Sequence, residues 1–473
     1  MKLRLLFSTS VMVLSLLCCN VMMLAKTGGN CGGVSCYDPC VKWELDDNGV
    51  LTLTGDWSPS NNYGGKMGYF NSKIAVPWNK SAIVKIVVKN GVSGIGAEAF
   101  MDCVNLKEVV FQQTDNPPLE FSQAVFKGCT SLESFSFPDY VVKMGFNTFE
   151  GCTSLKTVKL STGDKSIRQG FFKDCKKLSP EITLPDGILF IGNSAFENCT
   201  ALNTVVINDN CKTVAVHAFR WCVNLNKITI GKSVKEFGEA AFFSAGSGIE
   251  RHVIIRDMAT YCQANFATSN VSGYWQASSP ICYNNTNLYI GDINHPVTHL
   301  DIPEGVTEIK TEHFIYLCNL NSITIPTTMR SLGGRTFRCG NNVWDFIECW
   351  AATPPDVEDS GFVSISSYNN TKLYVPKGSL SKYKSHKIWG QFKSIEEKDI
   401  TEGVEIIDKE DPIKVYVDGG QIIVDGADEG TAMQVYSLDG KCVYGGAVEA
   451  VNAPSAGVYI VRVAGKAIKV MVK

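Results

Sequence analysis

The heptapeptide Phe149-Glu-Gly-Cys152-Thr-Ser-Leu155 carries the pattern that decides how this chain folds. A phenylalanine is followed three residues later by a cysteine and, after three more, by a leucine. The same order recurs at Phe126/Cys129/Leu132, Phe172/Cys175/Leu178, Phe196/Cys199/Leu202 and Phe219/Cys222/Leu225. From Phe126 to Phe242, the phenylalanines that begin this pattern, together with Phe242, are 23 or 24 residues apart. A fixed period of this length is typical of repeat proteins, so each repeat is predicted to form one coil of a solenoid.

A short strand is predicted after each repeat leucine. Apolar residues stand three and five positions later, as in Leu155/Val158/Leu160, and such alternation indicates a strand with one buried face. Stacked coils then form a parallel strand ladder over a continuous core. Five residues before the phenylalanines stands another apolar residue, which is often followed by a glycine, as in Ile191-Gly192; this favours a tight bend between two sides of the coil.

The first 25 residues have the features of an export signal. Lys2 and Arg4 precede the apolar run 5–17, and Ala25 is followed by polar sequence. The run is too short to span a bilayer comfortably, and no later stretch reaches about 18 consecutive apolar residues. We therefore expect an exported protein without a transmembrane segment. Alternatively, Leu17-Cys18 loosely matches a lipoprotein cleavage site, which would add a lipid anchor.

The regions flanking the repeats differ from them in pattern. Residues 41–54 read as a hairpin around Asp47-Asn48-Gly49, and 253–261 and 373–383 each read as a strand followed by a helical turn that could close a repeat block. The periodicity breaks between Phe242 and Phe314. The expected organisation is a signal peptide (1–25), an N-terminal β cap (26–90), first repeats (91–245), an irregular insert (246–300), second repeats with a C-terminal cap (301–397), a linker (398–412) and a small all-β sandwich (413–473).

Bulk composition and motifs narrow the classes of function. The formal net charge is -3 with a pI near 6.1, so no basic field would attract nucleic acid. The sequence contains no nucleophile elbow, phosphate-binding loop or dinucleotide fingerprint. We therefore expect a protein that is not an enzyme and has neither catalytic residues nor a cofactor. His295 and His299 lie four residues apart without a metal-binding helix pattern, so no metal site is expected.

The chain has 18 cysteines, which in an exported protein raises the question of disulfides. The repeat cysteines occupy one equivalent slot per coil, which favours inward packing as small side chains that help satisfy turn backbone groups. Disulfides between neighbouring coils remain an alternative, because the coil spacing permits them. Cys31, Cys36 and Cys40 form a separate group, for which a disulfide or free thiols are favoured over a metal site.

The Ala-Phe-x-x-Cys-x-x-Leu core and the run Ile302-Pro-Glu-Gly-Val-Thr-Glu-Ile309 resemble the BspA-like (Treponema-type) leucine-rich repeats of bacterial surface proteins, over roughly 91–397. The last 60 residues, through Val435-Tyr-Ser-Leu-Asp-Gly-Lys441 and 456–463, resemble the C-terminal sorting domain of the type IX (Por) secretion system of Bacteroidetes. The resemblance implies display on the outer-membrane exterior or secretion, through contact of the tail with the secretion machinery.

The strand positions that point away from the core form the candidate partner-binding surface, because a parallel ladder places them in rows across one concave face. They are Glu108, Val110, Ser134, Ser136, Thr157, Lys159, Glu181, Thr183, Thr204, Val206, Lys227, Thr229, Ser322 and Thr324. For any single residue, β-propensity alone explains a Thr or Ser equally well. The resemblance implies adhesion to a host extracellular-matrix or cell-surface protein, or to a partner bacterium. The alternative is glycan binding by Tyr261, Trp275 and Tyr283 of the insert.

Overall fold

The computed structural model describes most of the chain and divides it into two compact units. The described residues are 28–31, 41–60, 64–115, 117–178, 181–267, 278–281, 286–291, 296–339, 343–358, 361–398, 413–418, 420–427, 431–437, 442–453, 457–463 and 466–472. The first unit comprises Met1–Val205, Val214–Leu225 and Phe242–Ala245, and the second comprises the remaining residues. The expected signal peptide, Cys36, Cys40 and most of the expected linker lie outside the described residues.

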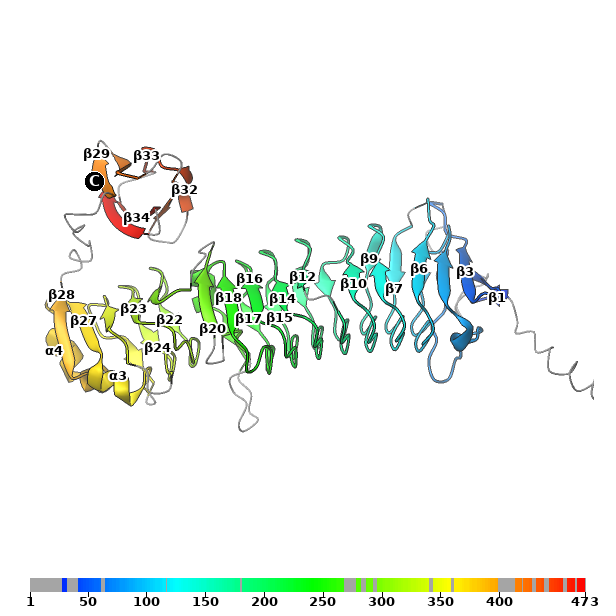
Figure 1. Ribbon diagram of the computed structural model, residues 1–473, viewed down its shortest axis with the longest axis horizontal. Helices are drawn as coiled ribbons and strands as arrows, with labels where there is room; N and C mark the ends of the chain where they lie inside the picture. Colours follow the sequence, from blue (N-terminus) through cyan, green and yellow to red (C-terminus); the bar gives the residue numbers. More distant parts are fainter. Residues whose placement is uncertain are drawn as a thin grey trace, which may run out of the picture. The chain divides into compact units, whose positions relative to one another are not determined.

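The first unit is a coil-by-coil solenoid that begins with the predicted hairpin (Figure 1). β2 (Val41–Leu45) pairs antiparallel with β3 (Val50–Gly55), and β3 pairs in parallel with β4 (Lys85–Val88), so the hairpin starts the parallel ladder. The further ladder strands are β6 (Glu108–Phe111), β8 (Ser134–Ser136), β10 (Thr157–Lys159), β12 (Glu181–Thr183) and β14 (Thr204–Val206). The strands predicted after each leucine are thereby confirmed.

A second row of short strands runs along the same coils. Its members are β5 (Gly94–Ile95), β7 (Leu119–Phe121), β9 (Val141–Lys143), β11 (Ser166–Ile167) and β13 (Phe190–Ile191), and β15 (Thr213–Val214) spans the division between the units. The additional elements of this unit are β1 (Gly28–Asn30), which pairs antiparallel with β2, and the 3-10 turn η1 (Lys80–Ala82).

The repeat phenylalanines form one continuous stack through the core of the first unit. Trp78 lies 5.4 Å from Phe100, measured between ring centroids, and is nearly parallel to it. From there the stack runs through Phe126, Phe149, Phe172, Phe196 and Phe219 to Phe242, with centroid distances of 5.1–5.8 Å. Every ring in it is at most 5% exposed. The 23-residue period therefore places one aromatic ring per coil directly over the next.

The repeat cysteines are free, buried thiols that each join two coils by a hydrogen bond. Each thiol donates to the carbonyl oxygen of the repeat phenylalanine in the preceding coil. The pairs are Cys129–Phe100, Cys152–Phe126, Cys175–Phe149, Cys199–Phe172 and Cys222–Phe196, with sulfur–oxygen distances of 3.0–3.1 Å. The inward-packing interpretation is confirmed for these five residues, and disulfides between their coils are absent.

These thiols are expected to be chemically inert in the folded chain. Burial raises the pKa of Cys152 and Cys222 to about 12, so at pH 8 only about one thiol in ten thousand is ionised. Iodoacetamide at pH 8, followed by peptide mass spectrometry, should leave both unmodified while the exposed Cys442 reacts, and should label all three in denaturant. Native labelling of Cys152 at the rate of Cys442 would contradict the buried hydrogen-bonded thiol.

Where a glycine stands four residues ahead of a repeat phenylalanine, it serves close approach between coils rather than an unusual backbone angle. A Cβ on Gly145 would collide with the carbonyl oxygen of Ser122, and one on Gly192 would collide with the backbone of the coil before it. The left-handed residue of the bend comes two positions later, at Asn147 (φ 53°) and Ser194 (φ 54°). The bend was predicted correctly, but its glycine has a different physical cause.

The second unit also consists mainly of coils with parallel strands. β16 (Lys227–Ile230), β18 (Arg251–Ile255) and β20 (Thr286–Ile290) pair in parallel, and β17 (Glu236–Phe237) pairs with β19 (Asn265–Phe266). A further parallel sheet has the order β21 (His299–Asp301), β23 (Ser322–Ile325), β25 (Phe346–Cys349), β27 (Lys372–Pro376) and β28 (Ser394–Lys398). Beside it lie β22 (Glu308–Ile309), β24 (Ser331–Leu332) and β26 (Asp356–Val357).

Two details of this unit differ from expectation. The segment 246–300 was expected to be irregular, yet β18 and β20 within it are regular ladder strands, because the alternation in 251–255 and 286–290 survives without the Phe-x-x-Cys signature. The strand-then-helix segments are present, with α2 (Met258–Cys262) after β18 and α4 (Leu380–Ser385) after β27. Neither strand ends its sheet, since β20 and β28 follow. The other helical elements among the described residues of this unit are α3 (Ile365–Asn370) and the 3-10 turn η2 (Trp389–Gln391).

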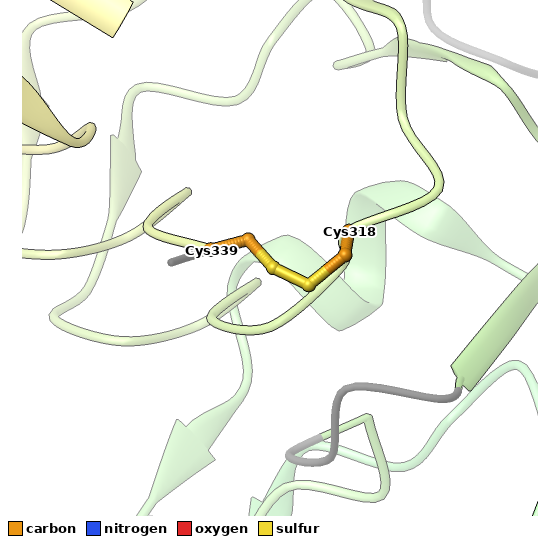
Figure 2. Close-up of a disulfide and its surroundings, with 2 residues drawn as sticks. All are labelled: Cys318 and Cys339. Atoms are coloured by element: carbon orange, nitrogen blue, oxygen red, sulfur yellow. A yellow bond between two sulfur atoms is a disulfide. The ribbon is translucent and has the colours of Figure 1, made fainter. Parts of the chain in front are cut away.

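One pair of neighbouring coils in the second unit is joined by a disulfide between Cys318 and Cys339 (Figure 2). The Cα atoms are 5.4 Å apart, as the coil spacing permits. Here the slot three residues after Phe314 holds the buried Leu317 and the cysteine stands one position later. A one-residue shift therefore moves the sulfur out of the core slot and lets it reach the next coil.

The C-terminal module is all β, as predicted. One sheet contains β29 (Lys414–Asp418), β30 (Gln421–Asp425) and β33 (Val451–Asn452), and the other contains β32 (Cys442–Ala447), β31 (Ala432–Ser437), β34 (Gly457–Val463) and β35 (Lys466–Val472). Their inward residues form one core that includes Ile422, Met433, Val435 and Val461. Among the described residues, no helix is long and apolar enough to cross a membrane.

Candidate binding face

The outward positions of the ladder strands form the candidate binding face, or ladder face. Eight of the fourteen predicted residues are exposed: Glu108, Ser134, Ser136, Thr157, Lys159, Glu181, Thr183 and Lys227. Val110, Thr204, Val206 and Thr324 are half-buried. Parallel pairing places neighbours side by side, with Ser134 opposite Thr157 and Ser136 opposite Lys159. The period of the repeat therefore turns sequence positions 23 residues apart into lateral neighbours.

A hollow of about 350 Å³ opens in this face between β10 and β12. Thr157 and Lys159 line it from one strand and Glu181 and Thr183 from the next, above an apolar base that includes Leu178. Two hydroxyls, an ammonium group and a carboxylate thus surround one depression, and together they supply hydrogen-bond donors and acceptors. Four of the predicted residues are brought together here.

Two of the predicted residues are wrong as surface positions. Thr229 is 6% exposed and Ser322 is 5% exposed. Ser322 lies between His299 and Phe346 on the adjacent strands, and those two rings approach to 5.9 Å, so they cover the small side chain between them. Thr229 lies beside the larger Ile254. A small outward residue is buried when its neighbours on the adjacent strands are bulky. Strand alternation predicts only the direction of a side chain and not its burial.

The ladder of the second unit carries a hydrogen-bonded chain of side chains. His299 Nδ1 lies 2.6 Å from the Ser322 hydroxyl, and His299 Nε2 lies 3.1 Å from Asp301 Oδ1 and 3.1 Å from the Thr324 hydroxyl. Thr324 in turn donates to Glu348 at 3.4 Å. Because Ser322 is buried, this Ser-His-Asp set has no accessible nucleophile, and it links the strands laterally instead.

The hydrogen-bonded chain ends at Lys398, which contacts a carboxylate and an aromatic ring. Lys398 Nζ donates to Glu348 at 2.8 Å and lies 5.3 Å from the ring centroid of Tyr374. Burial works to lower the pKa of His299, but the hydrogen bond that its ring donates to Asp301 and the charges of Asp301 and Glu348 outweigh this effect, and the pKa is raised. His299 therefore keeps its second proton to a higher pH than a free imidazole does.

Sequence reasoning missed His299, Phe346, Glu348, Tyr374 and Lys398 as members of the face. His299 was considered only as a metal ligand, and the other four stand in coils without the cysteine signature. The segments Phe346-Ile-Glu-Cys349 and Lys372-Leu-Tyr-Val375 show the same alternation of inward and outward residues, so extending the strand register to them would have found Phe346, Glu348 and Tyr374. In the described parts of the chain, no group of three or more His, Cys, Asp or Glu side chains could hold a metal ion.

The predicted aromatic sugar site of the insert is wrong for Tyr261. Its side chain is 1% exposed, its hydroxyl lies 2.9 Å from the Ser279 hydroxyl, and its ring packs against His313 and Phe266. An aromatic ring in this position is part of the core. Trp275 and Tyr283, the other members proposed for that site, lie outside the described residues.

Comparison with protein families agrees with the repeat geometry. The model of the BspA type leucine rich repeat region matches residues 78–180, 119–250 and 293–410, with six copies. The chain belongs to the BspA-type leucine-rich repeat family. Members of this family are generally surface or secreted proteins that take part in protein–protein interaction. No curated protein matches the chain.

Several solved structures are similar to this BspA-type chain. A leucine-rich repeat protein from Bacteroides ovatus is 17% identical, with a TM-score of 0.34, over 72% of this chain and all of that one. The T. pallidum leucine rich repeat protein is 20% identical, with a TM-score of 0.28, over 43% of this chain and 86% of that one. A leucine rich cell surface protein from Faecalibacterium prausnitzii is 17% identical, with a TM-score of 0.25, over 73% and 96%.

Proposed function

We propose that this BspA-type protein is an adhesin, displayed on the cell surface or secreted, that binds a protein of the host matrix, of a host cell or of another bacterium through its ladder face. The observation that carries the proposal is the hollow between β10 and β12, where four outward side chains converge. A surface of many short polar side chains gives small contributions per contact, which add up over a large interface.

The proposed route to the surface rests on the two ends of the chain. The first 25 residues have the composition of an export signal, and the C-terminal module resembles a type IX sorting domain through 435–441 and 456–463. Most of these two motifs lies in β31 and β34, which pair with each other inside the module. We infer that the tail is the part that contacts the secretion machinery and that the repeats are the part presented outside.

Bulky charged substitutions on the hollow should weaken partner binding without unfolding the coils. Thr157→Arg and Thr183→Arg change exposed side chains that line it, whereas Thr162→Arg changes an exposed threonine that is not on the ladder strands. The full chain is immobilised and tested against purified matrix proteins, host cells and other bacteria. We expect the first two variants to weaken the strongest interaction at least tenfold and Thr162→Arg to leave it unchanged.

Two outcomes would contradict the proposal. One is the absence of binding to all of these partners by the unaltered chain. The other is binding that stays the same in both hollow variants while circular dichroism shows each of them folded, since the ladder face would then not be the contact surface.

A further inference from the structure

A second hollow, of about 410 Å³, lies on the coils of the first unit away from the ladder strands. Its lining comes from the segment around Tyr69, from the bend residues Ala97 and Gln123 that follow β5 and β7, and from Gly145 and Phe146, which follow β9. Backbone hydrogen bonds from Phe70 to Ala97, from Glu98 to Gln123 and from Ala124 to Phe146 place these residues on four successive coils. The hollow is therefore built on regular, hydrogen-bonded backbone.

Two aromatic rings stand exposed at this hollow. Tyr69 is 70% exposed and Phe146 is 49% exposed, whereas the aromatic rings of the coil cores are buried. Three coil steps separate the two residues, which is about 14 Å at the usual strand spacing. Flat exposed rings beside a depression offer stacking surfaces to a ligand.

Small residues between the two rings form the depression. Ala97 occupies the coil position equivalent to those of Gln123 and Phe146, and Gly145 has no side chain, so the space above the buried Phe121 stays open. The amides of Asn71 and Gln123 lie at its sides. In the described part of the chain, the Gln123 side chain makes no hydrogen bond, so its donor and acceptor are free for a ligand.

The charged groups that line the hollow are both cations. Arg168 Nη2 lies 3.4 Å from Asp164, and its guanidinium lies 5.7 Å from the Phe146 ring centroid, so the arginine is held in place beside the aromatic surface. Lys143 is exposed and forms no ion pair with any described residue. No carboxylate belongs to the lining, although the chain as a whole has a net charge of -3. This local reversal of charge favours an anionic ligand.

We propose that this hollow binds an acidic oligosaccharide, such as a run of uronic acid residues, with pyranose rings against Tyr69 and Phe146 and carboxylates at Lys143 and Arg168. Sugar rings present flat apolar C–H faces and hydroxyls together, which matches aromatic rings alternating with amides. An acidic peptide would satisfy the cations but would leave the two ring surfaces without flat partners. The site uses different strands and a different class of ligand from the ladder face, so it is independent of the proposed adhesion.

The test is titration of the full chain with a labelled galacturonate hexasaccharide, measured by fluorescence polarisation. The chain should bind this probe more tightly than maltohexaose, and added salt should weaken the binding because the charges are exposed. Tyr69→Ala, Phe146→Ala and Lys143→Gln should each weaken it at least fivefold. Phe190→Ala removes a ring that is 40% exposed on β13 outside the hollow, and Thr157→Arg alters the ladder face, so both should bind as the unaltered chain does.

Three results would overturn the proposal. The first is no binding of the galacturonate hexasaccharide. The second is binding that the two aromatic variants leave unchanged while circular dichroism shows them folded. The third is equally tight binding of hexaglutamate with sensitivity to Lys143→Gln alone, which would assign the hollow to acidic peptides.

Discussion

Phe149→Ala is expected to destabilise the first unit by about 3–5 kcal/mol, the cost of removing a fully buried phenylalanine. The ring is 0% exposed and stacks against Phe126 at 5.7 Å and Phe172 at 5.8 Å, so its loss leaves a cavity with two unsupported ring faces. Each coil is stabilised mainly by its two neighbours. Phe149 lies inside the stack and not at its end, so its loss removes ring contacts with two coils. Chemical denaturation followed by tryptophan fluorescence and circular dichroism measures the loss.

Phe190→Ala is the matched control for this prediction. Its ring is 40% exposed on β13 of the same unit, so its removal should change the free energy of unfolding by less than about 1 kcal/mol. Equal losses for the two variants would show that the stacked array is not the main source of stability.

Gly145→Ala should destabilise the first unit by about 3 kcal/mol or more, although it adds one methyl group. The new Cβ would collide with the carbonyl oxygen of Ser122 on the adjacent coil. Backbone atoms cannot rotate aside as a side chain does, so the two coils must separate and weaken the hydrogen bond from Ala124 to Phe146. A thermal unfolding series should show a large drop in Tm.

Gly187→Ala is the comparison for this second variant. The nearest atom to a Cβ at Gly187 is the Thr162 carbonyl oxygen at 3.5 Å, an ordinary contact, and the backbone there needs no left-handed angle. Its Tm should stay within a few degrees of the unaltered chain. If Gly145→Ala behaved in the same way, close approach between coils would not be the reason for the glycine.

The solenoid was predictable because a single repeat encodes both its local strand and its contact with the next coil. The residues equivalent to Phe149, Cys152 and Leu155 recur at one constant spacing, so the sequence alone predicts that they stack from coil to coil. Trp78 was not predictable in this way, since it begins the aromatic stack from a segment that lacks the repeat cysteine. The same holds for β20, whose residues alternate between buried and more exposed positions in a segment without the Phe-x-x-Cys signature of the other coils.

The candidate sites were less predictable than the fold, because their properties depend on side chains from neighbouring coils. Alternation correctly placed Thr157 and Thr183 on the outside, but the burial of Ser322 is set by its larger neighbours. The second hollow depends on Ala97 being small between two exposed rings 77 residues apart in sequence, at Tyr69 and Phe146. Nothing in either segment alone indicates that they share a depression.

The direction of the thiol hydrogen bonds has a consequence for how such a chain can evolve. Each coil brings one donor, which serves the coil before it, and one acceptor, which serves the coil after it, as Cys175 does for Phe149. Tandem duplication or loss of a whole repeat in the gene keeps every donor matched to an acceptor, whereas a change of half a repeat does not. At the last ring of the first unit, Phe242, the donor slot is filled by the buried Ala245, which ends the series. Copy number can therefore change by whole repeats between two fixed ends, and the length of the presented surface changes with it.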